Sequence, residues 1–403
     1  MKQTFSRILI IVAAFLMQGI KSDAQPGEKR IQYPGALRNS YFGINIGAIN
    51  YRFSAAQLEP GYTVEKVQVP PMAVRLVLFG HQFNKHLAAQ ITYMRPVDWV
   101  KYKNINGNTK SHSLWMNVAG LTVAAQLPLE KKFSLFAEAG LGIITRKGFS
   151  INNNPVVKSA TYASLLSGVS LQCHLNKKWD LQLSAAWSPA NSTVKQPATV
   201  FYSVGFNYYM RPLAKEKVEQ NIKSGIRFPR QLIQIGFTTN GLGYGVNNAV
   251  SKGPIPIFWG GEAHLKQGIS VNYQRNIFHA KKVFAFDWGI TAGWWKSRDN
   301  NDEFYSFSLY PLLRFMTVRT KPLDLFFEYS VAGPSFISKT VIDNKETGKR
   351  FTFQDFMGMG IVAGKNRNMN AGIRIAHFSN GNIYPENDGV KVPLTFSIGY
   401  AFE

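Results

Sequence analysis

Strict alternation is found near the end of the chain, in the stretch Leu394-Thr395-Phe396-Ser397-Ile398-Gly399-Tyr400-Ala401-Phe402. Large apolar residues alternate there with small or polar residues. A period of two is typical of a β-strand, because successive side chains point to opposite faces of a sheet. The pattern recurs from about residue 40 onward, for example at residues 305–309 and 373–376. The sequence therefore predicts an all-β protein whose strands each have one apolar face.

The composition supports this prediction and excludes several other classes. Only 17% of the 403 residues are charged and 45% are hydrophobic, which excludes a disordered, charge-driven chain and a coiled coil. No stretch after residue 25 holds about 18 uninterrupted apolar residues, so we expect no membrane-spanning helix. Aromatic residues reach 13% and glycines number 34, a combination that favours β structure.

An export signal indicates what covers the apolar strand faces. Lys2 and Arg7 precede an apolar run at residues 8–17, and small residues follow it, so we expect residues 1–24 to be a secretory signal peptide. In an exported β protein, lipid can cover one face of each strand while the other lines a lumen. We therefore expect an antiparallel transmembrane β-barrel in the outer membrane of a Gram-negative bacterium. A soluble basic binding protein with packed apolar faces is the alternative.

The charge and the cysteine count fit an outer-membrane barrel. A formal net charge of +23 would suggest nucleic acid in a cytoplasmic protein, but an exported chain meets anionic lipid headgroups instead. We expect a membrane-lipid partner and no nucleic acid. Cys173 is the single cysteine, which excludes an internal disulfide, and we interpret it as an inert apolar-face residue.

The chain repeats itself at an offset of about 190 residues. Residues 131–138 resemble residues 321–328, and residues 202–208 resemble residues 396–402, in the same order. Each half therefore ends in its own aromatic, closing type of strand. This favours two tandem barrels over a single sixteen-stranded, porin-like barrel, which remains the alternative.

The segment between the halves has no strand pattern, and we interpret residues 212–230 as a linker. The two domains are then an N-terminal barrel at residues 38–211 and a C-terminal barrel at residues 231–403. Each half has room for about eight strands, the smallest common size for a membrane barrel.

Standard catalytic and metal-binding motifs are absent from the sequence, and we expect neither a metal nor a cofactor. One pair of residues stands out instead. His377 and Ser379 are two apart on a predicted strand and continue the apolar row of Ile373 and Ile375. Such groups are costly next to hydrocarbon unless they are bonded, and a His–Ser pair would create a nucleophile. An ordinary strand end at the water interface is the alternative.

The run His377-x-Ser379-Asn380, followed by Asn387-Asp388-Gly389, resembles the outer-membrane lipid A 3-O-deacylase (acyloxyacyl hydrolase) family. The similarity extends over residues 231–403. It implies an eight-stranded outer-membrane barrel with a Ser–His site on its outer wall, which removes an ester-linked acyl chain from lipid A.

The resemblance also implies roles for individual residues. Ser379 would be the nucleophile, His377 the general base and Asn387 part of the oxyanion hole. The family places an orienting acid where this chain has Lys391, a departure that Glu386 or Asp388 could compensate. We therefore predict a serine esterase that acts on lipid A or a related lipid. A non-enzymatic structural or binding barrel that has lost the acid is the alternative.

Other polar residues are assigned structural roles. The repeat places Ser188 opposite Ser379 but Ala186 opposite the base, so we expect no catalytic pair in the N-terminal barrel. Glu138 and Glu328 face away from the apolar rows, and we expect them to pair with lumen cations such as Arg374. The remaining histidines are expected at surfaces or in loops, namely His81, His86, His112, His174, His264 and His279.

Overall fold

The computed structural model describes residues 31–130, 132–224, 228–251, 261–280, 283–320, 322–381, 384 and 386–402. The expected signal peptide at residues 1–24 lies outside these ranges. The chain divides into two compact units, one formed by Leu37–Arg211 and the other by the residues from Pro212 onward, together with residues 31–36. Among the described residues, no helix has the length and hydropathy required to span a membrane.

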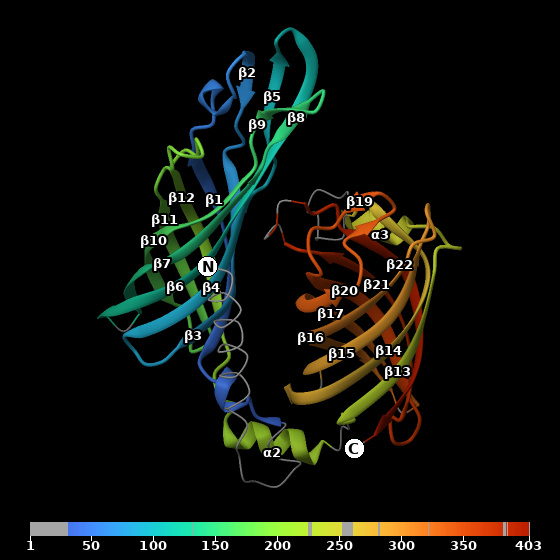
Figure 1. Ribbon diagram of the computed structural model, residues 1–403. Coiled ribbons are helices and arrows are strands. Elements are labelled where there is room, and N and C mark those ends of the chain that lie inside the picture. Colours follow the sequence, from blue (N-terminus) through green and yellow to red (C-terminus); the bar gives the residue numbers. More distant parts are fainter. Residues whose placement is uncertain are drawn as a thin grey trace. The chain divides into compact units, whose positions relative to one another are not determined.

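Eight antiparallel strands form a closed ring in the N-terminal unit (Figure 1). The ring closes because the first strand pairs with the last and because β6 pairs with β7. Its strands are β1 (Ser40–Tyr51), β3 (Met72–Gln82), β4 (Leu87–Pro96), β6 (Asn108–Glu130), β7 (Phe133–Lys147), β10 (Ala160–His174), β11 (Trp179–Ser188) and β12 (Thr199–Tyr209).

Short elements extend this ring at one end. β5 (Val100–Ile105) pairs with the start of β6, and β2 (Val64–Gln68) pairs with β5. β8 (Phe149–Ile151) and β9 (Asn154–Val157) form a separate hairpin. Of the two 3-10 turns among the described residues, Ala55–Gln57 follows β1 at this end, whereas Gly35–Leu37 precedes β1.

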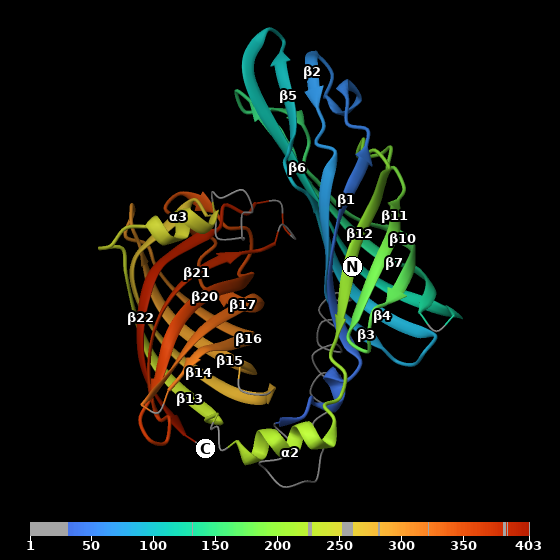
Figure 2. The ribbon, with the colours of Figure 1, turned by 180° about the vertical axis from the view of Figure 1, so that it is seen from behind.

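The second unit is also a closed eight-stranded antiparallel barrel (Figure 2). The all-β barrel prediction is confirmed, and the single sixteen-stranded alternative is wrong because each ring closes on itself. The strands are β13 (Gln231–Thr239), β14 (Ala263–Ala280), β15 (Phe284–Ser297), β16 (Glu303–Arg319), β17 (Leu323–Ile337), β20 (Phe351–Ala363), β21 (Met369–Ser379) and β22 (Val390–Phe402).

Two helices and a hairpin complete the described part of this unit. α2 (Lys215–Lys223) lies in the predicted linker and buries none of its residues, so its acidic first turn and basic last turn stabilise it locally. α3 (Gly245–Ser251) lies between β13 and β14, and β18 (Val341–Ile342) pairs with β19 (Lys345–Glu346) between β17 and β20.

The connections distinguish the two ends of the C-terminal barrel. Those at the end that holds the chain terminus are three to five residues long, whereas the β13–β14 connection at the other end spans residues 240–262. Outer-membrane barrels have short periplasmic turns and longer extracellular loops. The β21–β22 loop, residues 380–389, therefore lies at the extracellular end.

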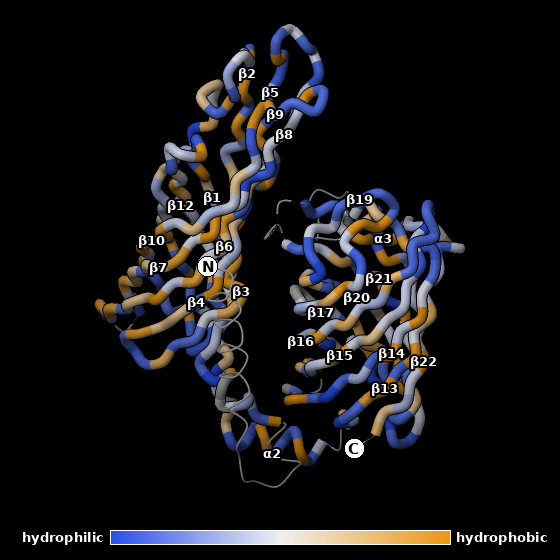
Figure 3. The backbone as a smooth tube through the Cα atoms, in the orientation of Figure 1, coloured by the Kyte–Doolittle hydropathy of each residue, from blue (hydrophilic) through white to orange (hydrophobic). Residues whose placement is uncertain are grey.

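Hydropathy alternates along the strands of both barrels (Figure 3). On β13, for example, Ile233, Ile235 and Phe237 are exposed, whereas Gln234 and Thr238 are buried. Apolar residues facing outward and polar residues facing the lumen are the arrangement of a membrane barrel.

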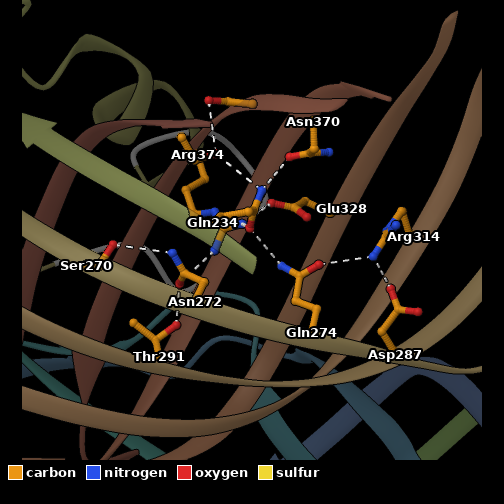
Figure 4. Close-up of polar contacts among 12 residues, drawn as sticks. Gln234, Ser270, Asn272, Gln274, Asp287, Thr291, Arg314, Glu328, Asn370 and Arg374 are labelled. Carbon is orange, nitrogen blue, oxygen red and sulfur yellow. Dashed lines mark hydrogen bonds and ion pairs between the residues drawn. The ribbon is translucent and has the colours of Figure 1, made fainter. Parts of the chain in front are cut away.

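A polar network fills part of the C-terminal lumen (Figure 4). Arg374 Nη2 lies 2.9 Å from Glu328 Oε1 and donates a hydrogen bond to Gln234 Oε1 at 3.1 Å. A second buried ion pair joins Arg314 to Asp287. The predicted role of Glu328 is thus confirmed.

Glu138 plays the equivalent part in the N-terminal lumen. Its carboxylate lies 2.6 Å and 2.9 Å from the two terminal nitrogens of Arg75. It also accepts hydrogen bonds from Gln90 Nε2 at 2.6 Å and Thr122 Oγ1 at 2.7 Å. The structural role predicted for Glu138 is therefore confirmed.

Candidate active site

The outer wall of the C-terminal barrel holds His377 and Ser379 near the extracellular end of β21. Ala376 and Phe378 pack inside the barrel, in the same apolar cluster as Phe356 of β20. Alternation therefore turns His377 and Ser379 outward, along the row in which Ile373 is exposed. His377 itself is buried by its neighbours in the wall, and Ser379 is half-buried.

Two strands flank His377, and each presents a charged residue to it. Asp355 of β20 is its cross-strand partner on one side, and Lys391 of β22 is its partner on the other. The three strands lie side by side in the barrel wall (Figure 2). Directly opposed residues of antiparallel strands have Cβ atoms about 5 Å apart, close enough for these side chains to interact.

A bulge in β22 places Lys391 in this row. The pairing of β21 with β22 shifts around Pro393, which has no N–H to donate to the ladder. Val390 and Val392 lie inside the barrel as a result. Lys391, between them, faces outward beside His377.

The imidazole of His377 is oriented toward the carboxylate of Asp355. The distance from Nδ1 to Asp355 Oδ2 is 3.5 Å, and the two side chains are only 5% and 11% exposed. This is an ion-pair distance, longer than an ordinary hydrogen bond. Because Nδ1 faces the acid, Nε2 is the nitrogen that can serve a hydroxyl group.

Asp355 was missed by sequence reasoning because it lies on another strand, 22 residues before His377. A local signal for it exists. The outward row of β20 reads Phe351, Phe353, Asp355, Met357 and Met359, so one carboxylate interrupts an apolar row.

Lys391, at the family's acid position, and the two residues considered as the acid, Asp388 and Glu386, have other contacts or are exposed. Lys391 Nζ donates to Asn248 Oδ1 of α3 at 3.1 Å. Asp388 Oδ2 accepts a hydrogen bond from the Glu346 backbone N–H at 2.9 Å, while Glu386 is exposed. Asp355 is thus the acid that the structure brings to His377.

Asn387 is held next to Ser379 through the residue that follows the serine. The Asn380 backbone N–H donates to Asn387 Oδ1 at 2.8 Å, which turns the NH₂ group of Asn387 away from that contact. The fully buried Asn380 side chain donates to the Thr347 carbonyl oxygen at 3.2 Å. In many hydrolases the N–H after the nucleophile forms part of the oxyanion hole. Here that N–H is bonded to Asn387 Oδ1, and the oxyanion role of Asn387 stays a prediction.

Comparison with known proteins identifies the family of this barrel. The sequence model of the family described as lipid A 3-O-deacylase (PagL) matches residues 267–401. The C-terminal barrel belongs to this family. The family match contains Asp355, His377, Ser379, Asn387 and Lys391.

A different family model, described as an OmpA-like transmembrane domain, matches residues 37–211. No curated protein matches the chain. Among solved structures, the outer-membrane enzyme PagL is 15% identical, with 43% of this chain and 99% of that chain covered and a TM-score of 0.30. Ail of Yersinia pestis is 17% identical, covering 42% and 96%, with a TM-score of 0.30. The N-terminal barrel domain of Pseudomonas aeruginosa OprF is 12% identical, covering 42% and 98%, with a TM-score of 0.26.

Unlike the deacylase-family barrel, the N-terminal barrel does not have its serine on the outer wall. Ala186 lies in the apolar core and Ser188 is 2% exposed, so both face the interior. The residue-by-residue superposition of Ser188 on Ser379 is therefore wrong, because the two serines lie on opposite faces of their strands. A slip of one residue turns a strand residue to the other face.

A hydrogen-bonded Ser–His–Asp series nevertheless occurs at the opposite end of the N-terminal barrel. Ser134 Oγ lies 2.8 Å from His174 Nε2, and His174 Nδ1 lies 2.8 Å from Asp180 Oδ1. This series differs from the Ser188 and Ala186 positions for which no catalytic pair was expected, and that expectation stays a prediction. Ser134 is only 1% exposed, so a substrate cannot reach it and we interpret the series as structural.

The other histidines only partly match the expected surface positions. His86 is exposed, in a loop. His81 Nδ1 lies 2.8 Å from Ser40 Oγ, and His279 is buried and stacked on Phe228. His112 stacks on Phe149, and His264 lies against Tyr244. Among the described residues, no group of three or more His, Cys, Asp or Glu side chains could hold a metal ion.

Proposed function

We propose that the C-terminal barrel is an outer-membrane serine esterase that removes an ester-linked acyl chain from lipid A or a related lipid. The observation that carries this proposal is the outward position of His377 and Ser379, within the family match and beside exposed apolar wall residues. An acyl chain in the outer leaflet would lie along that wall, with its ester near the half-buried serine.

The proposed chemistry is acyl transfer through an acyl-enzyme. Ser379 Oγ attacks the ester carbonyl carbon while His377 accepts the hydroxyl proton. Asn387 donates to the developing oxyanion, and the alcohol leaves with the proton from His377. Water, activated by the same imidazole, then attacks the acyl-serine and releases a fatty acid.

The N-terminal barrel has a different proposed role. It matches an OmpA-like transmembrane domain, and its Ser–His–Asp series is closed to substrate. We propose that it serves as a membrane platform or binds a partner. Export by residues 1–24, and residues 212–230 as the linker, remain predictions.

Mass spectrometry of lipid A from cells that express the wild type or Ser379→Ala tests the esterase. We expect the wild type to remove one ester-linked acyl chain and the variant to remove none. Ser192→Ala, at an exposed turn of the N-terminal barrel, is the control and should behave as wild type.

A non-enzymatic barrel is the second candidate, favoured by the lysine at the family's acid position. Identical, fully acylated lipid A in all strains, with the proteins confirmed in the outer membrane, would refute lipid A as the substrate and favour this candidate.

A further inference from the structure

We propose that Asp355 is the positioning acid of this site. The family's acid position, Lys391, is on β22, whereas Asp355 is on β20, the strand on the other side of His377. This inference rests on the proposed esterase function. It assigns the third member of a Ser–His–acid arrangement to a residue that lies outside the short Ser–His motif.

The strand order makes this change of strand geometrically simple. β21 has two neighbours, β20 and β22, and His377 is directly paired with one residue on each. Directly opposed residues of an antiparallel sheet have Cα atoms about 4.5–5.5 Å apart, so both partners lie within reach of the imidazole. An acid on either strand can therefore reach the same imidazole, and in this chain the carboxylate is on β20 while β22 has Lys391.

Asp355 contacts the ring nitrogen of His377 that a positioning acid requires. The 3.5 Å contact from Asp355 Oδ2 is to Nδ1 of His377, the ring nitrogen remote from the one that would serve Ser379. A carboxylate at Nδ1 selects the tautomer with a proton on Nδ1, so that Nε2 can accept the serine proton. Contacts of this kind are often long before substrate binds and shorten in the complex.

A β-bulge gives Asp355 its place. The pairing of β17 with β20 shifts between Ser330 and Gly333, directly opposite Asp355. Bulges interrupt the regular ladder and often re-aim a side chain next to an active site. The other strand that borders the β20–β21 pair is irregular nearby, since the pairing of β22 with β21 shifts opposite Ile375.

Charge balance explains why the acid is needed here. When His377 accepts a proton, it becomes a cation beside the ammonium group of Lys391, in a wall where both side chains are buried. Like charges in a poorly solvated site raise the free energy of the protonated imidazole. Asp355 offsets this repulsion from the other side. The polar surroundings also include Tyr329 of β17, which interacts electrostatically with Asp355, and Asn248 of α3, which bonds Lys391. His264 of β14 is the cross-strand partner of Lys391 on its other side.

The position of Asp355 is difficult to explain without such a role. A carboxylate in an outward, otherwise apolar row of a membrane barrel is costly unless it is paired. Its neighbours in the row, Phe353 and Met357, are apolar.

The test removes the acid from β20 with Asp355→Asn and places an acid on β22 with Lys391→Glu. The full chain, folded in detergent micelles, is assayed for fatty acid released from purified lipopolysaccharide, as wild type, Asp355→Asn, Lys391→Glu and the Asp355→Asn/Lys391→Glu double variant. We expect Asp355→Asn to lower kcat about 10²–10⁴-fold with little change in KM. The double variant should recover at least about tenfold of this loss, because a carboxylate again faces His377.

Glu303→Gln removes a carboxylate from an exposed strand end and is the matched control, expected to be as active as wild type. Resistance of the folded protein to heat in detergent checks that each variant forms its barrel. Wild-type kcat and an unchanged pH profile in Asp355→Asn would overturn the inference while leaving the esterase in place.

A second measurement decides the case even if no lipid is cleaved. The ¹⁵N chemical shifts of the His377 imidazole, assigned with His377→Gln, report which ring nitrogen has the proton. Asp355→Asn should move the proton away from Nδ1, because an amide group can donate to Nδ1 where the carboxylate can only accept. Unchanged ¹⁵N shifts would overturn the inference. Changed shifts, together with a wild type that cleaves nothing, would refute only the proposed function.

Discussion

Replacement of Glu138 by alanine is expected to destabilise the N-terminal barrel by about 4 kcal/mol, because it leaves a buried guanidinium without its counter-ion. Arg75 and Glu138 are 7% and 5% exposed, and the pair is bidentate. Removal of one member of such a pair typically costs about 3–5 kcal/mol. Gln90 and Thr122 also lose their acceptor, so the estimate lies in the middle of this range rather than at its lower end.

A double replacement separates burial of a charge from loss of a contact. In Arg75→Met/Glu138→Leu no buried charge remains, and apolar replacement of a buried ion pair is often neutral or stabilising. The donors of Gln90 and Thr122 still lack an acceptor, at about 1 kcal/mol each or more. We therefore expect the double variant to recover about half of the loss.

Urea unfolding followed by hydrogen exchange and mass spectrometry provides the assay, because peptides report each barrel separately. With an m-value of about 2.5 kcal/mol per M, the midpoint of the N-terminal peptides should fall by about 1.5 M in Glu138→Ala. Peptides of the C-terminal barrel in the same chain are the internal reference and should not shift. A loss below about 1 kcal/mol would refute the reasoning and would mean that water solvates Arg75 in the lumen.

Three further predictions concern individual contacts. Ser134→Ala should cost about 1–2 kcal/mol in the same unfolding assay and leave lipid A cleavage unchanged, because its hydroxyl is bonded but inaccessible. Gly348→Ala should reduce lipid A cleavage. Gly348 has a φ of 94°, and a Cβ there would collide with the Asn380 side chain next to the nucleophile. Cleavage at the wild-type rate would contradict this prediction. The pKa of Asp302 lies below its usual range, mainly because its carboxylate accepts a hydrogen bond from the Asp343 backbone N–H and to a smaller extent because a lysine is nearby. The stabilisation that this carboxylate gives the extracellular loops is therefore present above about pH 4 and is lost as the pH falls through the lowered pKa. Asp302→Asn should therefore remove the rise in protease sensitivity of these loops below about pH 4, and an unaltered rise would count against this contact.

Local patterns allowed most of the fold to be predicted. Alternation identifies strands because it reports side-chain direction directly, and the same parity placed Glu328 and Arg374 in one lumen. The internal repeat correctly favoured two eight-stranded barrels over a single sixteen-stranded barrel. The number of residues between the repeats was enough to indicate eight strands in each.

These patterns could not predict the register of the strand pairs or the positions of the β-bulges. Asp355 meets His377 only because β20 and β21 pair in one particular register, and the repeat superposed Ser188 on a serine of the opposite strand face. The Ser134–His174 contact joins two strand ends that are far apart in sequence. Long-range pairing is set by the closure of the whole ring, and no single stretch of sequence contains that information.

The extension of the N-terminal barrel leaves a partly open ladder. β2 pairs with β5 alone, so its other side has backbone N–H and C=O groups without a neighbouring strand of the described sheet. Such an edge can template the addition of a strand from another chain. Glu65 and Lys66 lie within this five-residue strand, and charge and short length both oppose unselective pairing. Any polypeptide that docks there must therefore match these charges, which makes β2 a selective edge and protects a crowded membrane surface from aggregation.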